Sequence, residues 1–184
     1  MTAEQPYELL REYDGFELRR YPEHVLAEVT VDGPFEGAGN RAFRSLFKYI
    51  SGANAPRGKI AMTAPVVQAE ADPVALTSEV SGDGTTKYRV AFVLPEHLSI
   101  DTAPAPTDPA VTLRTVPESV VVAVRFSGNW SEARYRRHLE RLRADVAAAG
   151  LTVTEPPRSA RFDGPFVPSF LRHNEVQFDV GVPL

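Results

Sequence analysis

Two phenylalanines, Phe43 and Phe47, stand four residues apart in a segment that also carries Arg44 and Lys48. On a helix, residues four apart lie on the same side, so the two rings would form one apolar strip with positive charges beside it. Such a strip could hold a flat apolar ligand, and Arg44, Lys48 or Arg41 could pair with acid groups at its rim. The alternative is that a loop covers both rings and that they are part of the core.

The helix that would carry these residues has more apolar surface than docking on a sheet requires. It is predicted from Pro34, since proline is favoured at the first helical position, to Ile50, before Gly52. On a helical wheel its apolar residues cover about 180°. A second helix, predicted from a cap at Ser131 to a stop at Gly150, has an apolar arc of only about 80°. The surplus on the first helix is therefore a candidate binding surface.

Composition and motifs exclude several other classes of site. The chain of 184 residues contains no cysteine, so it has no disulfide, no thiolate metal site and no cysteine nucleophile. It contains no Walker, His-Glu-x-x-His or Gly-x-Ser-x-Gly motif. A net charge of −4 at pH 7 argues against a general nucleic-acid surface. The first residues lack a signal-peptide pattern and no apolar run has membrane-spanning length, so we expect a soluble cytoplasmic protein.

An internal repeat organises the chain. The segments 16–38 and 111–133 align without a gap at a constant offset of 95 residues. The identical pairs are Leu18 and Leu113, Arg19 and Arg114, Pro22 and Pro117, Glu23 and Glu118, Val25 and Val120, Val29 and Val124, Gly33 and Gly128, and Ala38 and Ala133. One further pair, Phe35 and Trp130, is aromatic in both copies. Such a repeat constrains the architecture, because both copies are expected to form the same unit.

Each copy predicts a strand-strand-helix-strand-strand unit. Short apolar and β-branched runs on either side of each helix, separated by proline and glycine turns, are typical of strands. The predicted strands are 16–21, 24–31, 64–70 and 87–94 in the first copy and 111–116, 119–126, 158–162 and 174–180 in the second. Two such units pack best as one curved antiparallel sheet with the helices outside. We therefore expect one α+β domain over residues 1–184, with repeats at about 7–95 and 111–184.

Four stretches of the sequence are similar to one known family. They are YELLREYDGFELRRYP (7–22), FEGAGNRAFRSLFKYISGAN (35–54), KIAMTAPV (59–66) and PFVPSFLRHNEVQFDV (165–180). Together they resemble the SOUL/haem-binding-protein family, in order and over nearly the whole chain. The resemblance implies a distorted antiparallel β-barrel with two flanking helices and pseudo-twofold symmetry. It also implies non-covalent binding of haem or a free porphyrin in an apolar groove beside the first helix.

The resemblance and the helix pattern together give a set of candidate binding residues. The set is Phe43, Arg44, Phe47, Lys48, Met62, Phe166, Phe170, Arg172 and His173. Phe166 and Phe170, in the C-terminal segment, would form the wall of the groove opposite the helix. Met62 offers a soft surface that suits a flat aromatic ligand, or alternatively fills the core under the helix.

An iron ligand is not specified by the resemblance, because the family has no single fixed axial ligand. Some members place a histidine where this chain has Arg20. The side chains that could ligate iron are His24, His97, His138, His173, Met62 and several tyrosines. His173 could reach the metal if its loop closes over the cleft, and it is therefore the residue chosen among these as metal ligand. The leading expectation is an apolar pocket without an iron ligand.

Other functions stay open at this point. Similar two-repeat barrels outside the family bind varied small molecules as effectors, and some are hydrolases that use a glutamate and a tyrosine. Glu175 with Tyr88 or Tyr135 would be such a pair here, although likeness of fold is weak support for a function. An exposed aromatic edge could also bind a protein partner. The leading prediction is a monomeric tetrapyrrole-binding or carrier protein with no catalytic residue.

Overall fold

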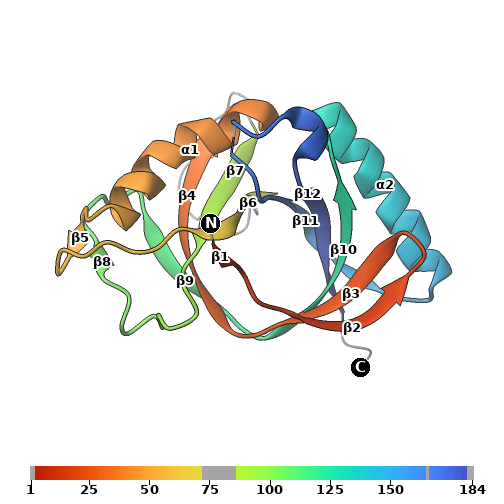
Figure 1. The fold of residues 1–184 in the computed structure, drawn as a ribbon, viewed down its shortest axis with the longest axis horizontal. Helices are drawn as coiled ribbons and strands as arrows, with labels where there is room; N and C mark the ends of the chain where they lie inside the picture. Colours follow the sequence, from red (N-terminus) through yellow and green to blue (C-terminus); the bar gives the residue numbers. More distant parts are fainter. Residues whose placement is uncertain (1–2, 72–85, 165, 182–184) are drawn as a thin grey trace.

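Two helices pack on the outside of one curved sheet (Figure 1). The computed structural model describes residues 3–71, 86–164 and 166–181. Helix α1 spans Phe35–Ile50 and helix α2 spans Glu132–Ala148. In the described parts of the chain, no helix is long and apolar enough to cross a membrane. The protein is thus α+β, with a large sheet that is antiparallel in all but one short pairing.

The main sheet has ten strands, of which nine follow the order β2-β3-β10-β12-β11-β6-β7-β4-β9, while β1 pairs with β6 in parallel. Their bounds are β1 Ala3–Glu4, β2 Glu8–Tyr13, β3 Phe16–Tyr21, β4 His24–Asp32, β6 Thr63–Glu70, β7 Lys87–Val93, β9 Thr112–Val116, β10 Ser119–Phe126, β11 Val153–Arg161 and β12 Asn174–Val180. A separate pair joins β5 (Asn54–Ala55) to β8 (Ala105–Pro106), and a 3-10 turn, η1, covers Ser169–Leu171.

The four strands and one helix predicted for each half are confirmed, with β11 beginning five residues earlier than expected. The predicted cap is confirmed as well, because the Ser131 hydroxyl accepts a hydrogen bond from the Arg134 backbone N–H at 3.3 Å. Strand β2 was not predicted. It lies at the edge of the sheet with most of its side chains exposed, so it lacks the alternation of apolar and polar residues that marks a half-buried strand.

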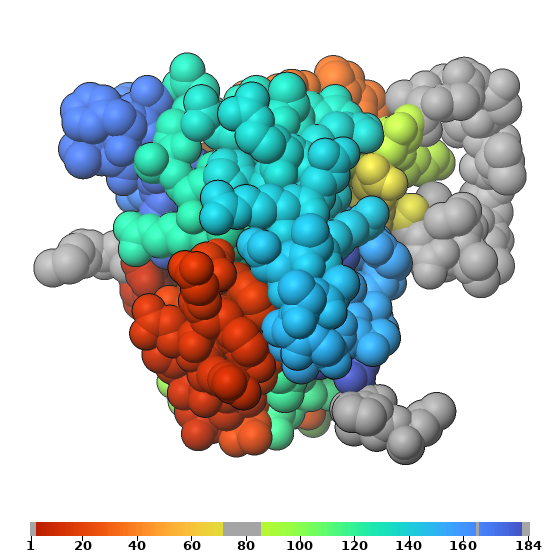
Figure 2. All heavy atoms as spheres, turned by 90° about the vertical axis from the view of Figure 1, so that its right-hand side faces the viewer, coloured from red at the N-terminus to blue at the C-terminus, as the bar shows by residue number. Residues whose placement is uncertain are grey.

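The β2–β3 hairpin packs beside α2 on one side of the molecule (Figure 2). Its turn contains Gly15, whose φ of 97° is in the left-handed region that favours glycine. A β-carbon at this position would stand within ordinary contact distance of the Asp145 and Arg141 side chains on α2. The hairpin therefore closes one end of the sheet against the second helix.

The strand order supports the internal repeat. The matching strands of the two halves are β3 and β9, β4 and β10, β6 and β11, and β7 and β12. When each of these eight strands is replaced by its match, the resulting order is the original order read backwards. The two equivalent aromatic residues, Phe35 and Trp130, stack on each other at 4.9 Å between ring centroids. Within the described residues no pairing joins β2 to β9, so the sheet is an open curved surface. Closure into a distorted barrel is not confirmed, and the repeat stays a prediction.

Strand alternation gives the sheet two chemically different faces. Along β12, Val176 and Phe178 point to the helices and are completely buried, while Glu175, Gln177 and Asp179, which alternate with them, point to the concave face. Helix α1 docks on the convex face through Ala38, Ala42 and Leu46, which are all at 0% exposure. The main hydrophobic core thus lies between the sheet and the helices, while the concave face carries most of the buried charges and a smaller apolar cluster of Leu26, Ala91 and Val93.

This arrangement predicts a sharp contrast between two neighbouring residues of α1. Leu46→Ala should lower the free energy of unfolding by about 2–5 kcal/mol, because it leaves a cavity in the core. Phe47→Ala should lower it by about 0.5–1 kcal/mol, because that ring is half exposed and loses only one stacking partner. Urea denaturation of both variants measures the difference, and equal losses would contradict the described face of α1.

Candidate functional site

A stripe of two exposed aromatic rings runs along α1. Phe43 is 40% exposed and Phe47 is 48% exposed, and their rings stack at 5.5 Å between centroids with an interplanar angle of 13°. Phe43 also meets the buried ring of Phe92 edge-on at 5.6 Å, which fixes its position over the core. The alternative in which a loop covers both rings is therefore not what the structure shows. Both rings are accessible to a ligand.

The stripe ends at a positive charge that the sequence did not reveal. Gly39 precedes Phe43 by four residues, and the Arg161 guanidinium lies so close to it that a β-carbon at this position would overlap the charged group. The same guanidinium lies over the Trp130 ring, 5.0 Å from its centroid. It makes no hydrogen bond or ion pair with any residue that the structure describes. A glycine in mid-helix, on the same side as the exposed rings, is the only sequence signal that could have indicated this contact.

Arg161 is a cation held in a low-dielectric setting without a carboxylate. Its side chain is partly buried, and burial, with a smaller contribution from the nearby Arg172, lowers the pKa of the guanidinium. The group remains charged at neutral pH, because arginine starts from a pKa above 12. A partly buried cation with no counter-charge is stabilised by any anion that can reach it.

Three further predicted binding residues are Arg44 and Lys48 on α1 and Met62 in the segment that follows it. Arg44 and Lys48 are exposed on α1, each one residue beyond a phenylalanine of the stripe. Met62 is partly buried and packs against the core, in agreement with the alternative that it fills space there.

The C-terminal loop does not form a closed wall. Phe166 is 98% exposed and Phe170 is 72% exposed, so neither ring packs against α1. The Arg172 Nε donates to the Val167 carbonyl oxygen at 2.8 Å, which folds this side chain back on its own loop. Gly128, in the turn before α2, donates its backbone N–H to the Ser169 carbonyl oxygen at 2.9 Å. The loop is thus anchored near the start of α2, and its two phenylalanines stand clear of the protein.

His173 is engaged in a polar contact instead of pointing to the exposed rings. Its Nε2 lies 2.7 Å from a carboxylate oxygen of Glu175, and its ring stacks on Phe162 with 3.9 Å between centroids. The side chain is only 14% exposed. Among the described residues, no group of three or more histidine, aspartate and glutamate side chains could hold a metal ion. The geometry therefore gives no support to His173 as an iron ligand.

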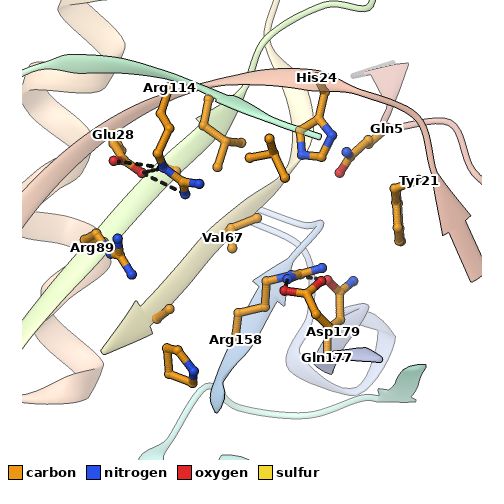
Figure 3. A pocket seen from close by; sticks show the side chains of 15 residues that line it. Gln5, Tyr21, His24, Glu28, Val67, Arg89, Arg114, Arg158, Gln177 and Asp179 are labelled. Carbon is orange, nitrogen blue, oxygen red and sulfur yellow. Dashed lines mark hydrogen bonds and ion pairs between the residues drawn. The ribbon is translucent and has the colours of Figure 1, made fainter. Parts of the chain in front are cut away.

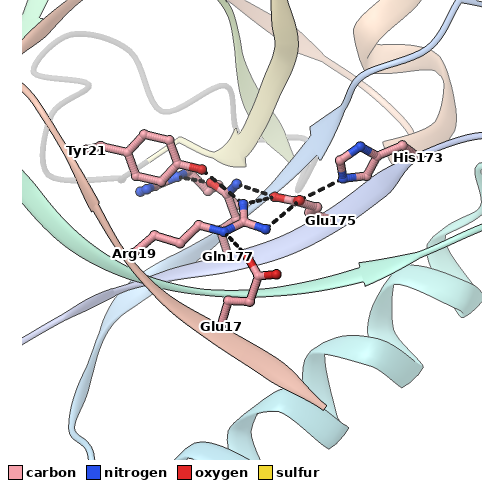
Figure 4. A network of polar contacts seen from close by, with 7 residues as sticks. Glu17, Arg19, Tyr21, His173, Glu175 and Gln177 are labelled. Atoms are coloured by element: carbon pink, nitrogen blue, oxygen red, sulfur yellow. Dashed lines mark hydrogen bonds and ion pairs between the residues drawn. The ribbon is translucent and has the colours of Figure 1, made fainter. Parts of the chain in front are cut away.

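Glu175 is the centre of a buried charge network on the concave face (Figure 4). Its carboxylate is 0% exposed and pairs with the 4% exposed Arg19 through two hydrogen bonds of 2.9 and 3.0 Å. Gln177 donates to the same carboxylate at 2.7 Å, and Arg19 also contacts the Glu17 carboxylate at 2.6 Å and the Tyr21 hydroxyl at 3.1 Å. Burial alone would raise the pKa of Glu175, but the hydrogen bonds and the charge of Arg19 together lower it.

The catalytic pair considered for a hydrolase is wrong. Tyr88 and Tyr135 both pack on Phe35 in the convex core, with ring centroids 5.9 and 4.8 Å from it. Glu175 faces the other side of the sheet, and both of its oxygens already accept two close contacts. Neither tyrosine can reach the carboxylate, and the carboxylate is held as a permanent ion-pair partner instead of being available as a base.

Several solved structures share this fold. The C-terminal domain of EcmrR has a TM-score of 0.66 at 16% sequence identity, covering 95% of this chain and 98% of that chain. A protein from Listeria innocua described as a hydrolase has a TM-score of 0.60 at 12% identity, covering 94% of each chain. At these identities the similarity concerns the arrangement of helices and strands alone.

The sequence comparison assigns the family. The chain belongs to the SOUL heme-binding protein family, whose model matches residues 2–179. Among its relatives is Heme-binding protein 1 of Xenopus tropicalis, which is 30% identical over 172 residues. The alignment covers 91% of this chain and 85% of that relative.

The buried ion pair makes a prediction about stability. Glu175→Gln should lower the free energy of unfolding by about 3–5 kcal/mol at pH 7, because it leaves the Arg19 guanidinium buried without its main partner. The matched control is Glu8→Gln in the exposed Glu8–Arg20 pair, which should cost about 0–1 kcal/mol. Urea denaturation gives both values, and a loss as small as that of the control would contradict the described network.

The same pair gives the sign of a pH effect. Because the folded protein lowers the pKa of Glu175, its contribution to stability is complete above the usual glutamate pKa and is lost as the pH falls through the lowered value. The wild type should therefore lose more stability than Glu175→Gln between pH 7 and pH 3. Parallel curves for the two proteins would show that this carboxylate does not titrate as described.

Proposed function

We propose that this protein binds haem or another tetrapyrrole non-covalently on the stripe of Phe43 and Phe47, with a propionate at Arg161. The observation that carries the proposal is the pair of stacked, half-exposed rings that ends at a partly buried cation without a carboxylate partner. Membership of the SOUL heme-binding protein family and the similarity to Heme-binding protein 1 support the choice of ligand.

The chemistry of the stripe matches the two parts of a tetrapyrrole. A porphyrin has an apolar face, which can stack on aromatic rings, and peripheral carboxylates, which pair well with guanidinium groups. From Gly39 to Phe47 the helix rises by about 12 Å, so ring and acid group can be held at the same time. Haem, when bound, would supply a redox-active iron. The chain's own residues bind the macrocycle, orient it and shield one face from water.

The expected affinity follows from the buried area. Removing about 400 Å² of apolar porphyrin surface from water contributes about 10 kcal/mol at 25 cal/mol per Å². Association and the ordering of side chains cost several kcal/mol of this. Micromolar to nanomolar binding without an iron bond is the expected result. Arg44 and Lys48 at the exposed rim would add about 0–1 kcal/mol each.

The other residues take secondary roles in the proposal. We infer that Met62 packs under the bound ligand and that Phe166 and Phe170 close over it by movement of their loop, with Arg172 at the rim. The rings of Phe166 and Phe170 are so exposed in the described structure that a large apolar ligand would be their natural partner. The groove beside α1 would then form fully only with the ligand bound, in one distorted barrel of two pseudo-repeats that acts as a single domain.

Hydrolysis is not proposed as a second function. The Listeria innocua protein described as a hydrolase shares the fold at 12% identity, and a shared fold does not transfer an activity. The glutamate that would serve as a base here is the partner of Arg19.

A hemin titration followed at the Soret band tests the site. Phe47→Asp should weaken hemin binding at least tenfold, because it replaces an apolar stacking surface with a charged group that must lose its water when the porphyrin face covers it. Leu9→Asp, at a residue that is 50% exposed on β2 and far from α1, is the matched control and should bind as the wild type does. Equal effects of the two substitutions would overturn the location.

Arg161→Gln separates the carboxylate contact from the aromatic one. It should weaken hemin binding about three- to tenfold while the protein keeps its fold, because no described residue depends on the charge of Arg161 for an ion pair.

A parallel titration with metal-free protoporphyrin tests whether iron is ligated. Since His173 is held by Glu175 and Phe162, we expect the affinities for hemin and protoporphyrin to agree within about threefold, and His173→Ala to leave hemin affinity unchanged. A response to hemin alone that His173→Ala abolishes would contradict an iron-independent site.

A further inference from the structure

The concave face of the sheet contains a second candidate site, on the opposite side from α1 (Figure 3). It is a cavity of about 180 Å³ between strands from both halves of the chain. A cavity of this size suits a small ligand. Neither the family nor the stripe on α1 accounts for it.

The pairing register sets two arginines on either side of a gap. Arg158 on β11 pairs with Ala69 on β6, and Ala69 pairs in turn with Arg89 on β7. Residues paired in this way point to the same face, and all three line the cavity. The two arginines are two strand spacings apart, about 10 Å between their α-carbons. Because the residue between them is alanine, the space between the two long side chains is not filled.

The cavity has more positive than negative charge. Arg114 is paired with Glu28, with nitrogen–oxygen distances of 3.1–3.2 Å. Arg158 donates to Asp179 at 2.8 Å and to Gln177 at 3.0 Å. The guanidinium of the third arginine, Arg89, makes no hydrogen bond or ion pair with any residue that the structure describes.

Unused hydrogen-bond donors remain on all sides of the cavity. A guanidinium has five N–H donors, so Arg114 and Arg158 keep some after their ion pairs, and Arg89 keeps all of its own. The Tyr21 hydroxyl accepts a bond from Arg19 at 3.1 Å and can therefore donate its own proton. Figure 3 shows the guanidinium groups of Arg89, Arg114 and Arg158 arranged around Val67.

The protonation state of His24 bears on the charge of the cavity. Burial lowers the pKa of His24 at the edge of the cavity, while its hydrogen bond with the Pro22 carbonyl oxygen raises it. Arg158 and Arg114 each lower this pKa by more than Asp179 raises it, and the net shift is downward. His24 is therefore neutral at pH 7 and adds no charge to the cavity. The floor between the arginines is apolar, since it is made of Leu26, Val67 and Ala91.

We propose that this cavity binds a small organic dianion with two carboxylate groups, one at Arg89 and the other on the side of Arg158. Two separate cationic positions match two separated acid groups, and guanidinium groups bind carboxylates with paired N–H donors. The short apolar floor fits a chain of two or three methylene carbons between the acids. The proposal does not depend on tetrapyrrole binding, because the two sites lie on opposite faces of the sheet.

Calorimetric titration with succinate at low ionic strength tests the proposal. We expect saturable binding at one site, with malonate and glutarate binding less tightly or equally and the neutral succinamide not binding. Arg89→Gln should weaken succinate binding at least tenfold, and Arg89→Lys should weaken it less because it keeps the charge. The matched control is Arg137→Gln, at an exposed arginine of α2, which should bind as the wild type does.

Three outcomes would overturn the proposal. The first is that the wild type does not bind succinate at millimolar concentrations of succinate. The second is that Arg89→Gln leaves the affinity for succinate unchanged. The third is that the wild type binds inorganic phosphate but none of the dicarboxylates. A competition experiment with hemin tests whether the two sites bind their ligands independently. Saturation with hemin should leave succinate affinity unchanged, and displacement of succinate by hemin would show that the cavity takes a propionate instead. Unchanged hemin binding by Arg89→Gln verifies that this variant is folded.

Discussion

The alternation of side chains along the strands is the constraint on which the rest of this structure depends. Both helices pack on one face, so every second residue of β4, β7, β10 and β12 must be apolar, and the residues between them are turned to the concave side. Polar groups on that side are shut away from much of the solvent and need partners. Arg19 and Glu175 meet this need for each other, which ties the first hairpin to the last strand.

The two helices pack on the same face of the sheet but leave different amounts of apolar surface exposed. Helix α2 buries Tyr135, Leu142 and Val146 and has little apolar surface beyond them. Helix α1 approaches the sheet through small residues and Leu46, and still carries Phe43 and Phe47 outside the contact. Exposed rings of this kind reduce solubility, and a ligand that covers them is the explanation proposed above. The asymmetry between otherwise matching helices is thus the strongest structural sign of a function.

Local patterns were sufficient to predict the helices and eight of the strands, because periodicity and turn residues act over short distances. They showed the surplus of apolar residues on α1 but left open whether a loop covers Phe43 and Phe47. The contacts that define the sites could not be predicted in this way. Arg19 and Glu175 are 156 residues apart, and the place of Arg161 against Gly39 depends on how β11 meets α1. The supposed partnership of Glu175 with Tyr88 or Tyr135 failed for the same reason, since it required knowing which face each strand residue takes.

The exchange of strands between the halves has a consequence for synthesis. Strand β3 pairs with β10, and β4 pairs with β9, so each half of the sheet contains a strand made in the other half. A nascent chain that has left the ribosome as far as α1 has no partner for the inner edge of its first hairpin. That edge stays open until β10 has emerged, which ends at Phe126, 76 residues after the end of α1 at Ile50. An open edge invites aggregation. A chaperone that shields it in the meantime would matter more here than for a protein whose halves fold one after the other.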